Sequence, residues 1–176
     1  SGGLLEAEVF YSRAKSGITA NLKATSADAE TTSEGNVSLA DADALVLTNL
    51  RTADGAISVR AYGNLTATSV KALGTNDAND VTLEALATGA GVSNLVATDL
   101  SAAGAGDLKL VAHGTFTQGA QAISADVLDV EAAGWAPVFD GVDFTSVYFG
   151  GGTPSLLSPP AMSRLFDTLY TAFAVP

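Results

Sequence analysis

Short segments of alternating polar and apolar residues recur about every twenty residues through most of this 176-residue chain. They read NVSL, AISV and DVTL, for example. The first apolar residues of six such segments are Ile18, Val37, Ile57, Val81, Leu108 and Val127, at spacings of 19, 20, 24, 27 and 19 residues. A period in this range is typical of solenoids, in which one repeat cannot bury its apolar face alone and stacking on neighbours completes the core. The repeat therefore predicts an all-β solenoid over residues 17–134.

A second strand is expected in each repeat, after a turn that contains glycine or Asp-Gly. These second strands are predicted at residues 44–52, 64–72, 92–102 and 115–125. Paired short strands fit either a coil that stacks like strands in parallel or an antiparallel β-sandwich. Similar residues recur at the same point of each repeat, which favours a parallel β-helix and leaves the sandwich as the alternative. The two longest spacings predict inserted loops around residues 74–80 and 89–91.

The composition argues against several classes of binding partner and several kinds of chemistry. Nineteen acidic residues face eight basic ones, giving a formal net charge of −11, which repels nucleic acid and anionic membranes. No apolar run is long enough to cross a bilayer, so we expect no membrane insertion. The chain has no cysteine, which excludes thiol catalysis, disulfides and Cys-ligated metal centres within it. It starts without Met, so we expect a processed or excised piece.

Both ends differ from the repeats. Residues 1–16 are more apolar and aromatic than the repeats and are predicted to cap the first coil, as a short strand or a helical turn. Residues 135–176 hold eight of the twelve aromatic residues, and a strand is predicted at 145–149. Ser158 before Pro159 is typical of a helix start. An apolar helix face follows, made of Met162, Leu165, Phe166, Leu169, Tyr170 and Phe173. We expect this C-terminal α-helix to cap the last coil near Val127 and Val130, or to pack on a neighbouring chain.

Residues 17–134 resemble the filamentous-haemagglutinin-type repeats of large bacterial surface and secreted proteins, through stretches such as GNVSLADADALVLTNL and GNLTATSV. The resemblance implies a right-handed parallel β-helix that a bacterium exports and uses for adhesion or as a stalk. It carries over no catalytic residue. The mid-chain spacings of 24 and 27 residues depart from a strict repeat.

Residues 144–173 resemble a strand–loop–helix unit of the radical S-adenosylmethionine enzymes related to coproporphyrinogen oxidase, through the string SVYFGGGTPSLLSP. In that family the glycine-rich loop approaches the amino-acid end of the cofactor. The resemblance would place the cofactor beside Gly150, Gly151, Gly152, Thr153 and Pro154. The family's iron–sulfur cluster needs three cysteines, which this chain lacks, so nothing would deliver the electron that cleaves the cofactor. We therefore expect no radical chemistry, and at most a cofactor-binding remnant.

A few polar residues are candidates for a site. His113 is the single histidine, and we interpret it as a solvated or turn residue. Residues 76–80, Asn-Asp-Ala-Asn-Asp, cluster oxygen ligands of the kind that Ca²⁺ prefers, although Asn and Asp that cap their own turn explain them better. Asp41 and Asp43 form a similar, weaker pair. We expect no metal or cofactor, with calcium as the one weak possibility.

Acidic polysaccharides are cleaved by some β-helix enzymes with carboxylates and a basic partner on one face. Candidates for such a group are Asp99, Asp107, Asp126 and Asp129, with Lys109 nearby. We interpret them as scattered surface acids. The isolated bases Lys23, Arg51, Arg60, Lys71 and Lys109 are expected to keep the sheet faces and edges soluble.

These features predict a structural or adhesive extracellular module that is not an enzyme and has no catalytic residue. The expected location is outside the cell or on a bacterial surface. Its expected partner is another copy of itself, through end-to-end or lateral assembly, or a surface ligand. The alternatives are a polysaccharide-active β-helix enzyme and a remnant that binds S-adenosylmethionine.

Overall fold

Every regular element that the computed structural model describes, over residues 3–135, is a β-strand. The strands are β1 (Leu4–Ala14), β2 (Ile18–Glu34), β3 (Val37–Asp41), β4 (Leu45–Asp54), β5 (Ile57–Ala61), β6 (Leu65–Ala72), β7 (Val81–Ala85), β8 (Leu95–Ala102), β9 (Leu108–Gln118), β10 (Ile123–Ser124) and β11 (Leu128–Trp135). The chain divides into two units, Ser1–Val138 and Phe139–Pro176. The strand predicted at 145–149 and the helix predicted over 158–173 lie outside the described residues, as does the loop at 150–154.

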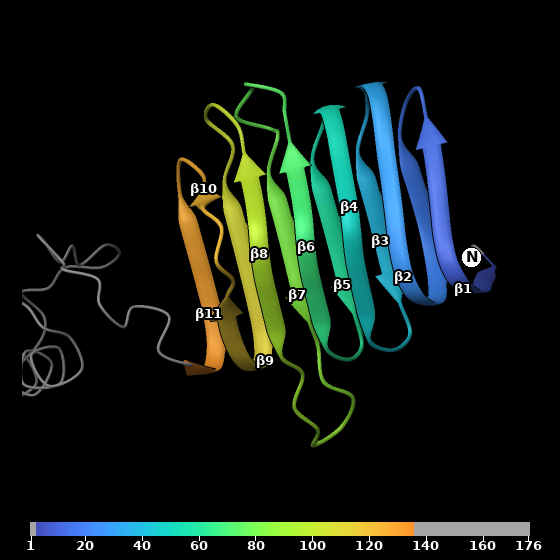
Figure 1. Cartoon of the computed structure of the whole chain (residues 1–176), viewed down its shortest axis with the longest axis vertical. Coiled ribbons are helices and arrows are strands. Elements are labelled where there is room, and N and C mark those ends of the chain that lie inside the picture. Colours follow the sequence, from blue (N-terminus) through green and yellow to red (C-terminus); the bar gives the residue numbers. More distant parts are fainter. Residues whose placement is uncertain (1–2, 136–176) are drawn as a thin grey trace, which may run out of the picture. The chain divides into compact units, whose positions relative to one another are not determined.

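The strands pair with their counterparts one repeat away. Within residues 3–135 every pairing is parallel. β3 pairs with β5 and β5 with β7, while β4 pairs with β6 and β6 with β8. Successive repeats therefore stack as coils, about six of them (Figure 1). The predicted parallel β-helix is confirmed, and the antiparallel sandwich is wrong.

The coils form two faces. The first face consists of residues 18–22 of β2, then β3, β5 and β7, and finally residues 108–112 of β9 and 128–132 of β11. The second face consists of residues 26–34 of β2, then β4, β6 and β8, and finally residues 116–118 of β9 with β10. β2 belongs to both faces because it continues around the turn between them. β1 follows β2 along both halves and adds one more rung.

On the first face, five of the six residues predicted to align do lie in one layer. Ile18 pairs with Val37, and the same layer continues through Ile57, Val81 and Leu108. The alignment of Val127 with this layer is wrong by one residue. Leu128 pairs with Leu108, and Val127 is 53% exposed.

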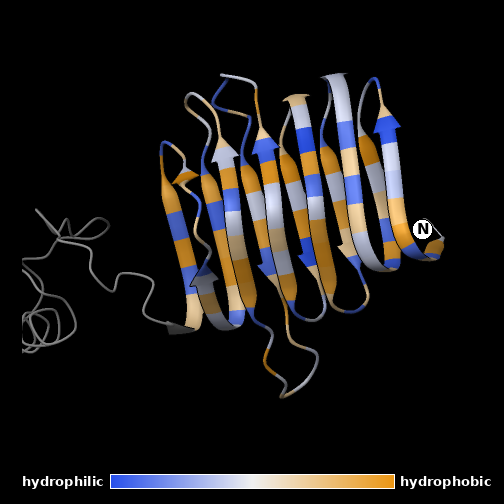
Figure 2. Cartoon of the chain, in the orientation of Figure 1, coloured by the Kyte–Doolittle hydropathy of each residue, from blue (hydrophilic) through white to orange (hydrophobic). Residues whose placement is uncertain are grey.

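Inward positions are occupied by small and medium aliphatic side chains. Along β3, β5 and β7, buried residues alternate with more exposed ones, which produces the banding in Figure 2. Leu, Val, Ile and Ala make up the buried apolar core of the described residues, together with the single aromatic residue Phe116. Stacking aligns these residues in layers, so each coil buries its apolar edge against the next.

Two loops are inserted into the coil, at residues 73–80 before β7 and 86–94 before β8 (Figure 1). They account for the two long spacings and confirm the predicted insertions. The tight corners elsewhere depend on glycine. Gly35 has φ +119°, and a Cβ there would lie 2.3 Å from the backbone nitrogen of Gly17 on the adjacent coil. A side chain at this corner would prevent the two coils from approaching each other.

Candidate functional surfaces

Asparagine and aspartate side chains link successive coils at the corner that precedes the first face. The Asn36 Oδ1 accepts a hydrogen bond from the backbone N–H of Ala56, 2.9 Å away on the next coil. The Asp80 Oδ1 accepts one from Asp107 at 3.0 Å, and the Asp107 Oδ1 accepts one from Val127 at 3.1 Å. Each side chain satisfies a backbone donor that the turn would otherwise leave without a partner.

A second ladder lies at the corner that precedes the second face. The Asn64 Oδ1 accepts a hydrogen bond from the backbone N–H of Asn94 at 2.8 Å. The Asn94 Oδ1 in turn accepts hydrogen bonds from the Thr115 backbone N–H and hydroxyl, at 2.9 and 3.0 Å. The prediction from the sequence did not include this role. The signal is present, because Asn or Asp stands immediately before an apolar strand start in several repeats.

Asp41 is a buried carboxylate, 1% exposed, at an inward position that Leu22 and Ala61 occupy on the neighbouring coils. Its Oδ2 accepts a hydrogen bond from the Ala24 backbone N–H at 2.9 Å, and its Oδ1 accepts one from the Asp43 backbone N–H at 2.8 Å. Burial raises the pKa of the Asp41 carboxyl above its ordinary value, although these hydrogen bonds oppose the shift. Asp43 supplies only its backbone here, so the two carboxylates do not form a ligand pair in this contact.

Loop 73–80 holds the predicted oxygen cluster, and its central side chain is already engaged. Asn79 is buried, its Oδ1 accepts a hydrogen bond from the Gly55 backbone N–H, and its Nδ2 donates to the Asn76 carbonyl at 3.2 Å. Asp80 belongs to the corner ladder. The segment is therefore capped within itself only by the contact of Asn79 with Asn76, and its side-chain oxygens cap backbone N–H groups of neighbouring coils instead of their own turn. No group of three or more His, Asp or Glu side chains placed to hold a metal occurs in residues 3–135.

The acidic residues considered for polysaccharide cleavage do not converge. Asp99 lies on the second face and pairs with Lys71 at 2.7 Å. Asp129 lies on the first face, where Lys109 contacts it at 3.6 Å and contacts Glu131 at 2.6 Å. The hydrogen bond with Glu131 raises the pKa of Lys109. Asp107 is part of a corner ladder, and Asp126 donates its backbone N–H to Gly106.

The basic residues of the described coils mostly form ion pairs between rungs. Arg60 contacts Glu84 at 2.5 Å, and this hydrogen-bonded partner raises the pKa of Arg60. Lys23 contacts Glu6 at 3.3 Å across the first two rungs. Arg51 lies outside these ion pairs and is exposed on β4. These pairs link the outer surfaces of adjacent coils, and each contributes little to stability because water screens it.

A groove of about 540 Å³ runs beneath loop 86–94 and includes His113 and Glu131 at its surface. His113 lies within β9 and is exposed, and its Nδ1 accepts a hydrogen bond from the Ala87 backbone N–H at 3.1 Å. The neutral ring therefore carries its proton on Nε2. The remaining lining consists of Ala, Gly and Val residues, none of which carries a nucleophile. His113 therefore anchors the loop through this hydrogen bond, and Glu131 contacts Lys109.

Gly150, Gly151, Gly152, Thr153 and Pro154, suggested for cofactor binding, lie outside the described residues. Among the elements of residues 3–135, none is a helix long and apolar enough to cross a membrane. Comparison of the chain with models of protein families, with curated proteins and with solved structures gave no match.

Proposed function

We propose that this chain is a structural or adhesive module of a bacterial surface or secreted protein, in which stacked coils serve as a stiff spacer. The observation that supports the proposal is that the polar side chains of the coils are engaged in contacts between coils. Asn, Asp, Lys and Arg residues cap the corners or link one rung to the next. A site for chemistry needs polar groups that are free and converge on one place.

The acidic composition is consistent with this role. The net charge of −11 disfavours nucleic acid and anionic membranes as partners, and salt outside the cell screens the repulsion within the coil. The resemblance of residues 17–134 to filamentous-haemagglutinin-type repeats supplies the bacterial and extracellular parts of the proposal.

The test separates binding from turnover. The purified chain is incubated with acidic polysaccharides and, separately, with cultured cells, and both retained protein and polysaccharide products are measured. A spacer or adhesin leaves every polysaccharide intact, and an adhesin also shows saturable retention. New reducing ends or unsaturated sugar products would contradict the proposal and favour a polysaccharide-active enzyme.

A further inference from the structure

The outer edge of β1 is a long, regular and unpaired strand edge. Among the described residues, β1 pairs only with β2, and the pairing runs from Leu4 to Ala14 without a register shift. Alternate backbone N–H and C=O groups on the other edge therefore have no strand partner. Such an edge recruits a further strand unless it is short, bulged or covered.

The side chains of β1 add an apolar surface to this edge. Leu4, Val9 and Tyr11 are 56%, 58% and 63% exposed. At the paired positions of β2 the chain has the polar residues Asn21, Ser26 and Asp28. β1 thus departs from the polar outer pattern of its neighbour, and clustered exposed apolar side chains mark an interaction site.

The opposite end of the described coils is a poor match for this edge. On the second face, residues 119–122 interrupt the outermost rung, and the strand that follows, β10, has two residues. On the first face, the chain of pairings places Glu131 at the register position of Leu4. A head-to-tail stack would therefore pair Glu131 with Leu4 and set it diagonally to Glu6, two residues along the strand, where like charges repel.

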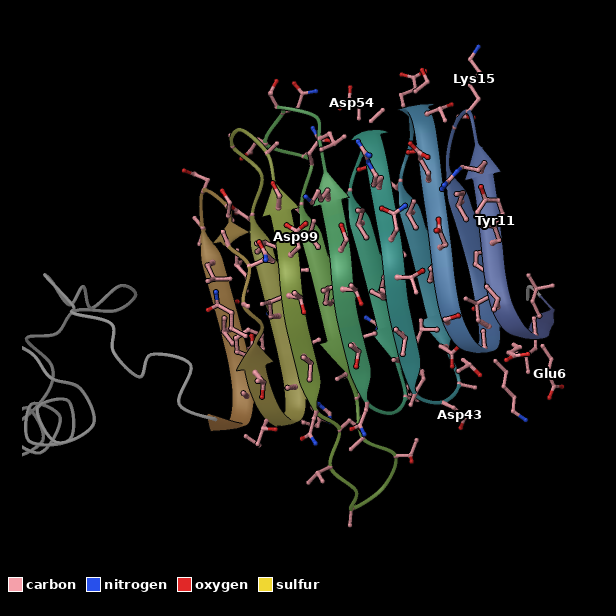
Figure 3. The ribbon with its side chains drawn as sticks, viewed as in Figure 1. Glu6, Tyr11, Lys15, Asp43, Asp54 and Asp99 are labelled. Carbon is pink, nitrogen blue, oxygen red and sulfur yellow. The ribbon has the colours of Figure 1, made fainter. Side chains whose placement is uncertain are left out.

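The charges along β1 select a different arrangement. Glu6 and Glu8 lie in its first half, whereas Arg13 lies near its end and Lys15 follows directly. Figure 3 shows Glu6 and Lys15 at opposite ends of β1, with Tyr11 between them. Two copies of β1 in antiparallel register set the acidic half of each copy against the basic half of the other, whereas parallel copies set like against like.

We propose that the chain forms a closed two-fold dimer through antiparallel pairing of β1 with β1 of a second copy, in the register that sets Glu8 of each copy opposite Lys15 of the other. The proposal rests on the structural role proposed above, and it names the surface for the self-assembly predicted from the sequence. A two-fold contact uses both open edges at once and stops at two copies, because the same patch serves both partners. In this register Val9 lies opposite Ala14 and Tyr11 opposite Ser12, so pairing removes apolar surface of Val9 and Tyr11 from water in both copies.

Glu8 and Lys15 give the sharpest test, because neither forms an ion pair within the described coils, so reversing them leaves the intrachain pairs intact. Light scattering after size exclusion measures the mass of the 176-residue chain over a range of concentrations. We expect a dimer for the wild type. Glu8→Lys and Lys15→Glu should each weaken the dimer about tenfold, since each introduces two like-charge contacts. The double variant Glu8→Lys/Lys15→Glu should restore it.

Asp77→Lys in loop 73–80 is the matched control, because Asp77 is exposed and its charge changes by the same amount far along the sequence from β1. It should dimerise like the wild type. A wild-type monomer at all concentrations would overturn the proposal. It would also be overturned if neither single substitution weakened the dimer, or if the double variant dimerised no more tightly than the single variants. Circular dichroism of every variant reports the fold, and a folded monomer leaves the proposed spacer role standing.

Discussion

The side chain of Asp41 has two opposing effects on the stability of the fold. Its carboxylate satisfies two backbone donors at a corner, yet it sits at an inward position where water is excluded. A neutral aliphatic residue would fit the layer of Leu22 and Ala61 but would leave the Ala24 and Asp43 N–H groups without an acceptor. The corner therefore retains a charged residue at the cost of desolvating it.

Replacing Asp41 by Ala should lower the free energy of unfolding by about 1–3 kcal/mol at pH 7, because two backbone donors lose their acceptors. Urea unfolding followed by circular dichroism measures the change. Asp43→Ala serves as the control, since the Asp43 side chain makes neither of these hydrogen bonds. Equal losses in the two variants would show that the Asp41 carboxylate is not the cap.

Asp41 should also give stability a distinctive pH dependence. A carboxyl whose pKa is higher in the folded chain than its ordinary 3.8 binds a proton more readily when folded. Its contribution to stability therefore increases as pH falls from neutral towards 3.8, the opposite of a carboxylate held in a favourable ion pair. The unfolding free energy of the wild type minus that of Asp41→Asn should therefore become more positive as pH falls over this range. A constant difference would contradict the raised pKa.

Loop 73–80 shows at the level of one element how an inserted segment is held against the coil. Asn79 reaches across 24 residues to the backbone N–H of Gly55 and also donates to the carbonyl of Asn76. The loop therefore docks through one buried amide side chain. Unlike a calcium loop, whose oxygen atoms remain free for the ion, this loop uses its central side-chain oxygen for the backbone.

Asn79→Ala should loosen loop 73–80 and lower the unfolding free energy by about 1–3 kcal/mol, because the Gly55 N–H is left without its partner. Hydrogen exchange should show faster exchange at Gly55 and within the loop. Asn76→Ala, which removes only an exposed contact with Asp54, is the matched variant with a smaller effect. Millimolar Ca²⁺ should leave the melting temperature of the wild type unchanged, and a clear rise would restore the calcium hypothesis.

The strands are largely predictable from the sequence, with two exceptions: the strand predicted at 115–125 is interrupted at residues 119–122, and the last repeat starts one residue later than predicted. In the last repeat the strand could begin at Val127 or at Leu128, which lie 19 and 20 residues after Leu108, and the period alone does not choose between them. Comparing three inward positions resolves the choice, because Leu128, Val130 and Ala132 match Leu108, Leu110 and Ala112. The corner caps were less predictable because their partners lie 17 to 30 residues away, and a contact between coils is known only once the register is known.

At the scale of the whole coil, each rung contacts mainly the rungs before and after it. The layers that run through Leu45 and Leu65 repeat at an offset of 20 residues, and both residues point into the core. Stability in such a stack is close to a sum over coils and their interfaces, so a complete coil is a removable unit. For folding, the position at which a deletion begins matters less than whether the remaining strands stay in register.

Deleting residues 45–64 should therefore yield a folded protein that is shorter by one rung, about 4.8 Å. The deletion joins Ala44 to Leu65, which takes the place of Leu45 in the same layer. Deleting residues 45–65 instead joins Ala44 to Thr66, which shifts the strand by one residue and turns its apolar side chains towards water. Circular dichroism and thermal melting should show cooperative β-structure for the first deletion and its loss or a much lower melting temperature for the second. If both deletions melted alike, the register between coils would not determine the fold, and the description of this molecule as a stack of equivalent rungs would fail.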